Sequence, residues 1–503
     1  MAMNSKAQEL KERLGEIIDL KGALAVLSWD QMTFMPPGGS EARGRQIATL
    51  ERLAHEKFIN PELGRLLDQI QPLLEELSPD SETAALIKVT TRDYQKALKI
   101  PPSFAARFSA HTSNTYEAWA RAKQERNFKI AEPFLEKTLE FSREMANFYP
   151  GYQHIADPLI DELDEGMTVG VIRPLFQKLR SELAPLVQKI TSQPGPDDSC
   201  LRGSFPKAEQ LEFGLEVARR LGYDLQRGRQ DISPHPFTTS FAISDVRITT
   251  RVREDFLAEA LFSTIHETGH ALYEQGINPD FDGTPLADGA SMSVHESQSR
   301  LWENIVGRSR NFWEFFYPRL QTLFPEQLNG VPLETFYRAI NKVERSLIRT
   351  DADEVTYNLH VMIRFDLETE LLEGKLTIKD LPEAWNERYR NDLGILPLDD
   401  GVGVLQDMHW YSGTIGGYFQ SYTLGNILSS QIFDAALHAN PEIQGEIEAR
   451  NFSGLHGWLK DNIYRYGRQY SAAKIIKTAT GRDLEIEPYI KYLKTKYEEI
   501  YEI

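Results

Sequence analysis

The residues that could do chemistry begin with His266, Glu267 and His270, which form an H-E-x-x-H pattern inside an apolar-periodic run. On a helix, positions i and i+4 lie on one face, so the two histidines can offer imidazole nitrogens to one metal ion. Glu267 is turned roughly 100° around the axis and can reach a metal-bound water without becoming a ligand. Two ligands and a general base are the arrangement of a zinc peptidase. A chance match is the alternative.

A catalytic zinc takes three protein ligands and a water, so the pattern needs a third ligand. The subclass that continues H-E-x-x-H-x-x-G-x-x-H is excluded, because Tyr273 and Gly276 stand where it has glycine and histidine. The other common choice is a carboxylate from a following helix, and Glu296, in a helix-like run, is our preferred ligand. A helix acid in an ordinary salt bridge is the alternative. Three further carboxylates lie in the Gly/Pro loop that follows the H-E-x-x-H helix: Asp280, Asp282 and Asp288.

Two later stretches, 348–364 and 403–422, carry more polar groups than core helices need. A peptidase transition state needs donors aimed at the developing oxyanion, and a histidine and a tyrosine on a loop after the metal site suit that role. If the terminal carboxylate of a substrate is held, an arginine must lie in the cleft, because its fork of donors matches a carboxylate. Arg349 is the best-placed candidate. For each of these residues a structural salt bridge or a satisfied core histidine is the alternative.

The elements that must position these residues are mostly helices. Residues 235–243 and 245–252 are the exception, because the second of them alternates β-branched with polar residues. We therefore expect a small antiparallel β element just before the metal helix, where a peptide could dock on a sheet edge. Apolar periodicity predicts helices at about 7–27, 62–77, 81–98, 103–127, 131–148, 169–191 and 206–221, with later loops at 276–293, 324–333 and 395–417.

The composition is that of an ordinary globular protein, with 41% apolar and 26% charged residues. A net charge of −18 makes the chain a poor non-specific partner for nucleic acid or an anionic membrane. The single cysteine, Cys200, permits no intramolecular disulfide, which fits a reducing compartment. We find no secretory signal and no apolar run long enough to span a membrane, so we expect a soluble, cytoplasmic protein. Because no break reads as a linker, we expect residues 1–503 to form a single peptidase domain.

Several motifs occur in a fixed order along the whole chain. They are His235-Pro236-Phe237, Asp245-x-Arg247-x-Thr249, His266-Glu267-x-x-His270, His295-Glu296-Ser297-Gln298, Ile348-Arg349-x-x-Ala352-Asp353 and Gly403-x-x-Gln406-Asp407-x-His409-Trp410. This set closely resembles the thermostable carboxypeptidase 1 family of metallocarboxypeptidases, peptidase family M32. The resemblance implies a mainly helical, two-lobed fold around a deep central groove, similar to angiotensin-converting enzyme and neurolysin.

The resemblance also implies an activity. Such enzymes remove single residues from the C-terminus of peptides with broad specificity, usually excluding a C-terminal proline. The cofactor would be zinc, one ion per subunit, with cobalt able to replace it. The partners would be peptides with a free C-terminus and a second copy of the chain in a homodimer.

Roles for individual residues follow from the same resemblance. Carried over by position, the metal ligands and the general base are His266, His270, Glu296 and Glu267. By looser analogy with the helical relatives, His409 and Tyr422 would stabilise the oxyanion. Arg349 and Gln406 would contact the C-terminal end of the substrate, and His235 is grouped with them as substrate-binding.

Three other functions remain open. An endo-oligopeptidase of the same architecture would cleave internally and tolerate a C-terminal amide. An aminopeptidase would need an acidic anchor for the substrate amine, usually in a G-x-M-E-N-like segment, which the sequence lacks. A structural zinc protein would close its metal with four ligands and hydrolyse nothing.

Overall fold

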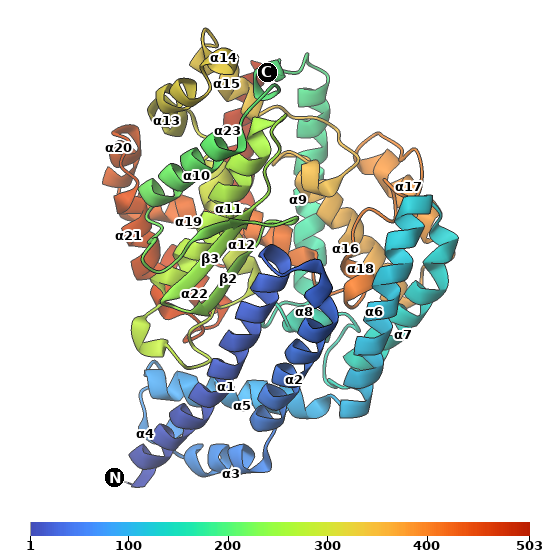
Figure 1. Ribbon diagram of the computed structural model, residues 1–503, viewed down its shortest axis with the longest axis vertical. Coiled ribbons are helices and arrows are strands. Elements are labelled where there is room, and N and C mark those ends of the chain that lie inside the picture. Colours follow the sequence, from blue (N-terminus) through green and yellow to red (C-terminus); the bar gives the residue numbers. More distant parts are fainter. Residues whose placement is uncertain (1) are drawn as a thin grey trace.

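The computed structural model describes residues 2–503, and side chains from residue 5 onward. Helices make up most of this chain (Figure 1). The helices before the sheet are α1 (Ala2–Thr33), α2 (Ser40–Phe58), α3 (Pro61–Ile70), α4 (Leu73–Glu76), α5 (Glu82–Lys99), α6 (Pro102–Glu125), α7 (Glu132–Asn147), α8 (Asp157–Asp161), α9 (Val169–Thr191) and α10 (Lys207–Leu221). Within residues 2–503, no helix combines the length and the apolar character that a membrane span requires.

The helices after the sheet include the two that carry His266, His270 and Glu296. They are α11 (Leu257–Gly276), α12 (Met292–Arg300), α13 (Arg310–Leu323), α14 (Pro325–Leu328), α15 (Leu333–Ile340), α16 (Tyr357–Glu373), α17 (Leu381–Asp392), α18 (His409–Ser412), α19 (Gln420–Ala439), α20 (Glu442–Glu448), α21 (Ser453–Asn462), α22 (Ala472–Thr480) and α23 (Glu487–Tyr501). A π-helix, Leu301–Val306, follows α12 without a break. The mainly helical fold expected from the sequence is confirmed.

The strands of the described chain form one small sheet in the order β1-β3-β2. Strands β2 (Thr238–Ala242) and β3 (Asp245–Thr250) pair antiparallel, as expected, with an irregularity in register between Ser240 and Ala242. The expected antiparallel pair is therefore confirmed, and strand β1 (Gln230–Ile232), which the sequence did not predict, adds to it by pairing parallel with β3, so that the sheet is mixed. Three residues are too short to show an alternating pattern, and pairing with β3 defines this strand.

Helix α19 joins two large apolar clusters among the described side chains. Leu424 and Ile427 belong to a cluster with α6, α7, α9, α16, α17 and α23. Leu428 and Ile432, about one turn further on, belong to a second cluster with α10–α13 and α20–α22. A helix that is apolar around much of its circumference is buried on several sides. In Figure 1 the helices of the first cluster lie largely on the right and those of the second on the left, with α1 and α2 in front.

Helices α11 and α12 approach each other closely because Gly269 has no side chain. A Cβ at this position would lie 2.6 Å from the main-chain oxygen of Gln298 and 2.6 Å from Cα of Ser299. Gly425 of α19 packs in the same way, since a Cβ there would lie 2.6 Å from Cγ of Glu296. Ser291 caps α12 by accepting a hydrogen bond of 3.2 Å from the Val294 amide. These contacts hold α12 between α11 and α19.

Candidate active site

Three side chains from α11 and α12 converge as a metal site would require. His266 and His270 lie one turn apart on α11, and Glu296 faces them from α12. Oε2 of Glu296 is 3.7 Å from Nε2 of His266 and 3.6 Å from Nε2 of His270. One ligand atom from each of the three residues lies within 4.8 Å of the others. The structure therefore brings together the three residues selected from the sequence as metal ligands.

The outer nitrogen of His266 is held by a carboxylate. Its Nδ1 lies 2.8 Å from Oε2 of Glu303, in the π-helix. Arg300 donates to the same oxygen at 3.2 Å, and Arg308 donates to the other oxygen at 3.4 Å. Burial would raise the pKa of Glu303, but Arg300 and the other cationic neighbours outweigh it and hold this pKa well below its usual range. Glu303 is thus an anion that fixes the His266 ring.

The outer nitrogen of His270 meets a second imidazole. Nδ1 of His270 lies 2.7 Å from Nδ1 of His295, and Nε2 of His295 lies 2.7 Å from Oε1 of Glu274. Burial, together with the neighbouring His295 and His266, lowers the pKa of His270 well below its ordinary value, so this ring is neutral. Burial also acts to lower the pKa of His295, but the Glu274 carboxylate outweighs it and the pKa is raised.

The candidate general base, Glu267, lies beside the candidate metal ligands and is 6% exposed. Thr238, at the start of strand β2, donates a hydrogen bond of 2.7 Å to its Oε2. Burial raises the pKa of Glu267, while the charge of His266 and the Thr238 hydroxyl oppose the rise. A raised pKa brings a carboxylate closer to the range in which it can exchange protons near neutral pH.

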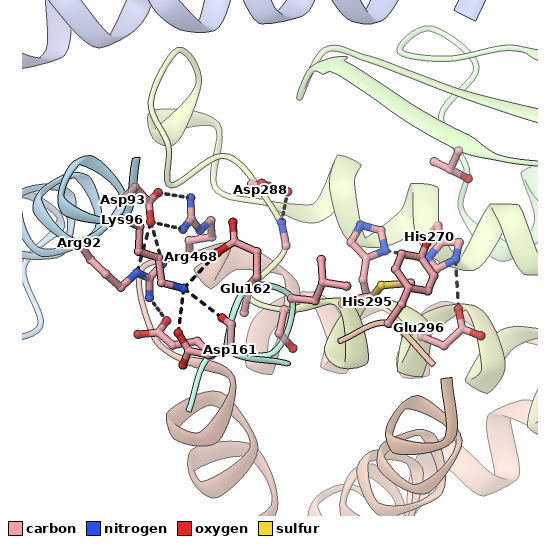
Figure 2. A pocket seen from close by; sticks show the side chains of 18 of the residues that line it. Arg92, Asp93, Lys96, Asp161, Glu162, His270, Asp288, His295, Glu296 and Arg468 are labelled. Atoms are coloured by element: carbon pink, nitrogen blue, oxygen red, sulfur yellow. Dashed lines mark hydrogen bonds and ion pairs between the residues drawn. The ribbon is translucent and has the colours of Figure 1, made fainter. Parts of the chain in front are cut away.

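These groups line a cavity of about 950 Å³. Figure 2 shows His270, His295 and Glu296 at one end and a cluster of charged side chains at the other. In that cluster Arg468 forms two bonds to Asp93, at 2.9 and 3.0 Å, and Lys96 lies 2.8 Å from Asp161. The cavity has the size of a small-ligand or peptide site, and it runs from the candidate metal ligands to an ionic network.

Arg349 and Gln406 lie in a buried polar cluster centred on Asp407. Arg349 bonds Asp407 at 2.7 Å, and Arg364 bonds its other oxygen at 2.5 Å. Burial would raise the pKa of Asp407, but the two guanidinium groups hold it far below its usual range. Gln406 accepts hydrogen bonds from the Arg349 amide and from Arg364, and donates to the carbonyl oxygen of Leu347. Both polar atoms of the Gln406 side chain are therefore engaged within the protein.

Of the two residues expected to stabilise the oxyanion, only Tyr422 lines the cavity, and His409 lies behind it. Tyr422 lines the cavity together with Tyr418, whereas His409 is not among the cavity-lining residues of the described chain. His409 Nε2 lies 3.3 Å from the Tyr422 hydroxyl, directly behind it. Burial, with Arg349 adding to it, lowers the pKa of His409 to about 4, so the ring is neutral near pH 7. Arg349 lies behind Tyr422 as well, 5.2 Å from its ring centre.

His235 does not join the cluster. Its side chain is exposed, and its main-chain oxygen accepts a hydrogen bond from Ser233. The next residues of the same motif, Pro236 and Phe237, do line the cavity, and Thr238 follows them. The His235-Pro236-Phe237 segment therefore delivers β2 to the site, and the side chain of His235 takes no part in this arrangement.

The sequence patterns did not predict every residue of the site. Thr238, Glu303 and Glu274 were not selected, and His295 appeared only as part of a motif. Glu274 lies one helical turn after His270, and Glu303 lies two turns after Glu296, so helical spacing could have indicated both. Thr238 gave no such signal, because its contact with Glu267 joins a strand to a helix.

Comparison with known proteins adds an independent finding. The family model of the carboxypeptidase Taq (M32) metallopeptidases matches residues 9–497. Thermostable carboxypeptidase 1 of Thermus thermophilus is 38% identical over 513 residues, and carboxypeptidase 1 of Bacillus subtilis is 36% identical over 502, with all of each chain covered. The crystal structure of an M32 carboxypeptidase from Deinococcus radiodurans superimposes with a TM-score of 0.97 at 47% identity, covering 99% of this chain and 100% of that one.

Proposed function

Since the chain belongs to the carboxypeptidase Taq (M32) family of metallopeptidases and is a metallocarboxypeptidase, we propose that it uses zinc to release single residues, with broad specificity, from the C-terminus of peptides. One observation carries the proposal. The ligand atoms of His266, His270 and Glu296 converge beside the buried Glu267 on the wall of one large cavity.

The donor set fits zinc. Two imidazole nitrogens and one carboxylate oxygen, with a position left for water, are the ligands of a catalytic zinc site. With bonds of about 2.0–2.1 Å, tetrahedral ligand atoms stand roughly 3.3 Å apart, and the 3.6 and 3.7 Å separations from Glu296 are close to that spacing. When bound, zinc would polarise the peptide carbonyl and acidify water. Cobalt, which accepts the same ligands, is proposed as a substitute.

Glu267 would act on protons. Its Oε2 is bonded to Thr238, which leaves Oε1 free to take a proton from the attacking water and pass it to the leaving amine. Because the carboxylate must be ionised to accept the proton, its raised pKa sets the acidic limit of turnover.

Tyr422 is the proposed donor to the developing oxyanion, because it lines the same cavity as the candidate metal ligands and carries a hydroxyl group. His409 would support that hydroxyl from behind, at 3.3 Å. Arg349 is proposed to hold the C-terminal carboxylate of the substrate. It has more N–H groups than its bonds to Asp407 and Tyr357 use. Gln406, whose polar atoms are engaged, would contribute by bonding the Arg349 amide.

One experiment tests the proposed activity. The zinc-loaded protein is incubated with a peptide, its C-terminal amide and its N-acetyl form, and the products are followed by mass spectrometry. Stepwise loss from the free C-terminus, blocked by amidation and not by acetylation, is the expected result. Cleavage of the amide at internal bonds would instead identify an endo-oligopeptidase, and blockage by acetylation an aminopeptidase.

We propose in addition that the protein is a cytoplasmic homodimer. A single cysteine supports a reducing compartment. Sedimentation of the purified chain tests the oligomeric state, and a sedimenting species of one chain's mass would contradict it.

A further inference from the structure

His295 lies between a metal ligand and a buried acid. Helix α11 supplies His270 and, four residues later, Glu274, and α12 places the His295 ring between their side chains. Both contacts are 2.7 Å long. The ring is fixed sideways as well, since Tyr273 packs against it with centres 5.1 Å apart. On its other edge a Cβ at Gly289 would lie 2.6 Å from its Cδ2.

When a metal is bound, the hydrogen bonds that link His270, His295 and Glu274 allow only one placement of their protons. Nε2 of His270 faces Glu296 and is the atom available to a cation, and an imidazole that binds a cation through Nε2 carries its one proton on Nδ1. That N–H needs an acceptor, and Nδ1 of His295 is the atom 2.7 Å away. His295 must then carry its own proton on Nε2, which donates to Glu274. A bound divalent cation opposes a second positive charge on His295.

We infer that His295 is a positioning residue for the metal site, which fixes the tautomer and the ring orientation of His270 through a relay that ends on Glu274. The inference rests on the metal site proposed above and assigns a role to two residues outside it. Outer partners of this kind orient a metal ligand and raise its basicity.

The two histidine ligands are therefore supported differently. His266 donates directly to the Glu303 carboxylate, whereas His270 reaches a carboxylate through a second imidazole. The first arrangement places a negative charge one hydrogen bond from the ligand, and the second places it one ring further away. Glu267 and Glu296 already place two carboxyl groups on the wall of this site. A neutral imidazole supplies the acceptor that His270 needs without adding another carboxylate beside them.

Two substitutions of His295 separate its two hydrogen bonds. In asparagine the amide oxygen stands two bonds from Cβ, as Nδ1 does in histidine, so His295→Asn retains an acceptor for His270. In glutamine the amide stands three bonds from Cβ, as Nε2 does, so His295→Gln retains a donor for Glu274 and loses the acceptor. The zinc dissociation constant of each variant is measured by competition with a chromophoric chelator. The visible absorption of the cobalt-loaded protein reports the ligand geometry.

We expect His295→Gln to bind zinc about 10- to 100-fold more weakly than the unsubstituted protein, with an altered cobalt spectrum. His295→Asn should lie within about threefold of it. Glu274→Leu should also weaken binding, and the double variant His295→Gln/Glu274→Leu should bind no more weakly than His295→Gln alone, because both act through one relay. Circular dichroism of the metal-free variants should be unchanged.

Results that contradict the relay differ from results that contradict the proposed function. Equal zinc affinity for His295→Gln and His295→Asn would overturn the relay, as would additive losses in the double variant. If the unsubstituted protein itself binds no zinc, the proposed function fails, and that result is seen before any variant is made.

Discussion

Thr238 Oγ1 lies 2.7 Å from Oε2 of Glu267 and 3.0 Å from the main-chain oxygen of the same residue. One hydroxyl of strand β2 thus holds the candidate base of helix α11. The same threonine lines the cavity in which a peptide would lie. The position of the base is therefore tied to the strand beside which the substrate would bind.

Removing that hydroxyl should shift the acidic limb of the pH profile. The Thr238 bond lowers the pKa of Glu267, which burial raises, so Thr238→Val should raise this pKa further. Glu267 must be ionised to accept a proton. As the pH is lowered, kcat/KM of Thr238→Val should therefore begin to fall at a higher pH than kcat/KM of the unsubstituted protein. A hydrogen bond to a charged group contributes about 1.5–3 kcal/mol, which corresponds to a shift of about one to two pH units. Thr238→Ser keeps the hydroxyl and serves as the control, and coincident profiles for the two variants would refute the link.

Glu267→Gln should retain the metal and lose turnover. The amide keeps the shape of the side chain, but it has no basic oxygen, so the expected loss of kcat is at least about 10²- to 10⁴-fold. Metal content measured by atomic absorption should match the unsubstituted protein. A fully active Glu267→Gln protein would show that the base is another group.

Gly269→Ala should displace α12 from α11. The added Cβ would stand 2.6 Å from main-chain atoms of Gln298 and Ser299, which cannot move aside as a side-chain end can. The expected cost is about 1–3 kcal/mol of unfolding free energy, together with weaker zinc binding because Glu296 lies on α12. Gly445→Ala, in helix α20 with open space around the new Cβ, is the matched control and should be neutral or stabilising. Urea unfolding and chelator competition measure the two effects, and similar behaviour of both variants would argue against close packing at Gly269.

Arg349→Ala should raise KM for peptides with a free C-terminus more than it lowers kcat, because binding of the terminal carboxylate is lost. Arg349→Lys keeps the charge and loses the fork of donors, so it should restore binding only in part. Steady-state kinetics on one peptide series gives both constants. A fall in kcat alone would indicate that Arg349 acts by supporting the Tyr422 ring, which it contacts.

Asp407→Asn should destabilise the fold. It leaves the side chains of Arg349 and Arg364, which are 7% and 0% exposed, without their shared anion. Breaking a buried ion pair on one side costs about 3–5 kcal/mol. The native carboxylate has a lowered pKa, so its contribution is present above the unfolded pKa and is lost only in strongly acidic solution. Asp255→Asn removes a carboxylate that pairs with Arg253 at the surface and should leave the unfolding midpoint nearly unchanged. Equal midpoints for the two variants would contradict the prediction.

The sequence alone determined the parts of the site that depend on local helix geometry. His266 and His270 share a face because they are four residues apart, and Glu267 lies beside them for the same reason. The absence of a third histidine indicated a carboxylate, and periodicity indicated the helix that carries Glu296. The mainly helical fold and the family followed from patterns and motifs of this kind, since each can be read within a short stretch of chain.

Only the tertiary structure decided which residues stand behind the proposed metal ligands and which face the cavity. Thr238 reaches Glu267 from a strand, His295 inserts between two residues of another helix, and Tyr422 lies in front of His409. These relationships depend on how helices and strands far apart in sequence pack together. Spacing along one helix fixes which residues share a face, but the distance between two elements is set by the packing of their side chains, down to the missing Cβ of Gly269.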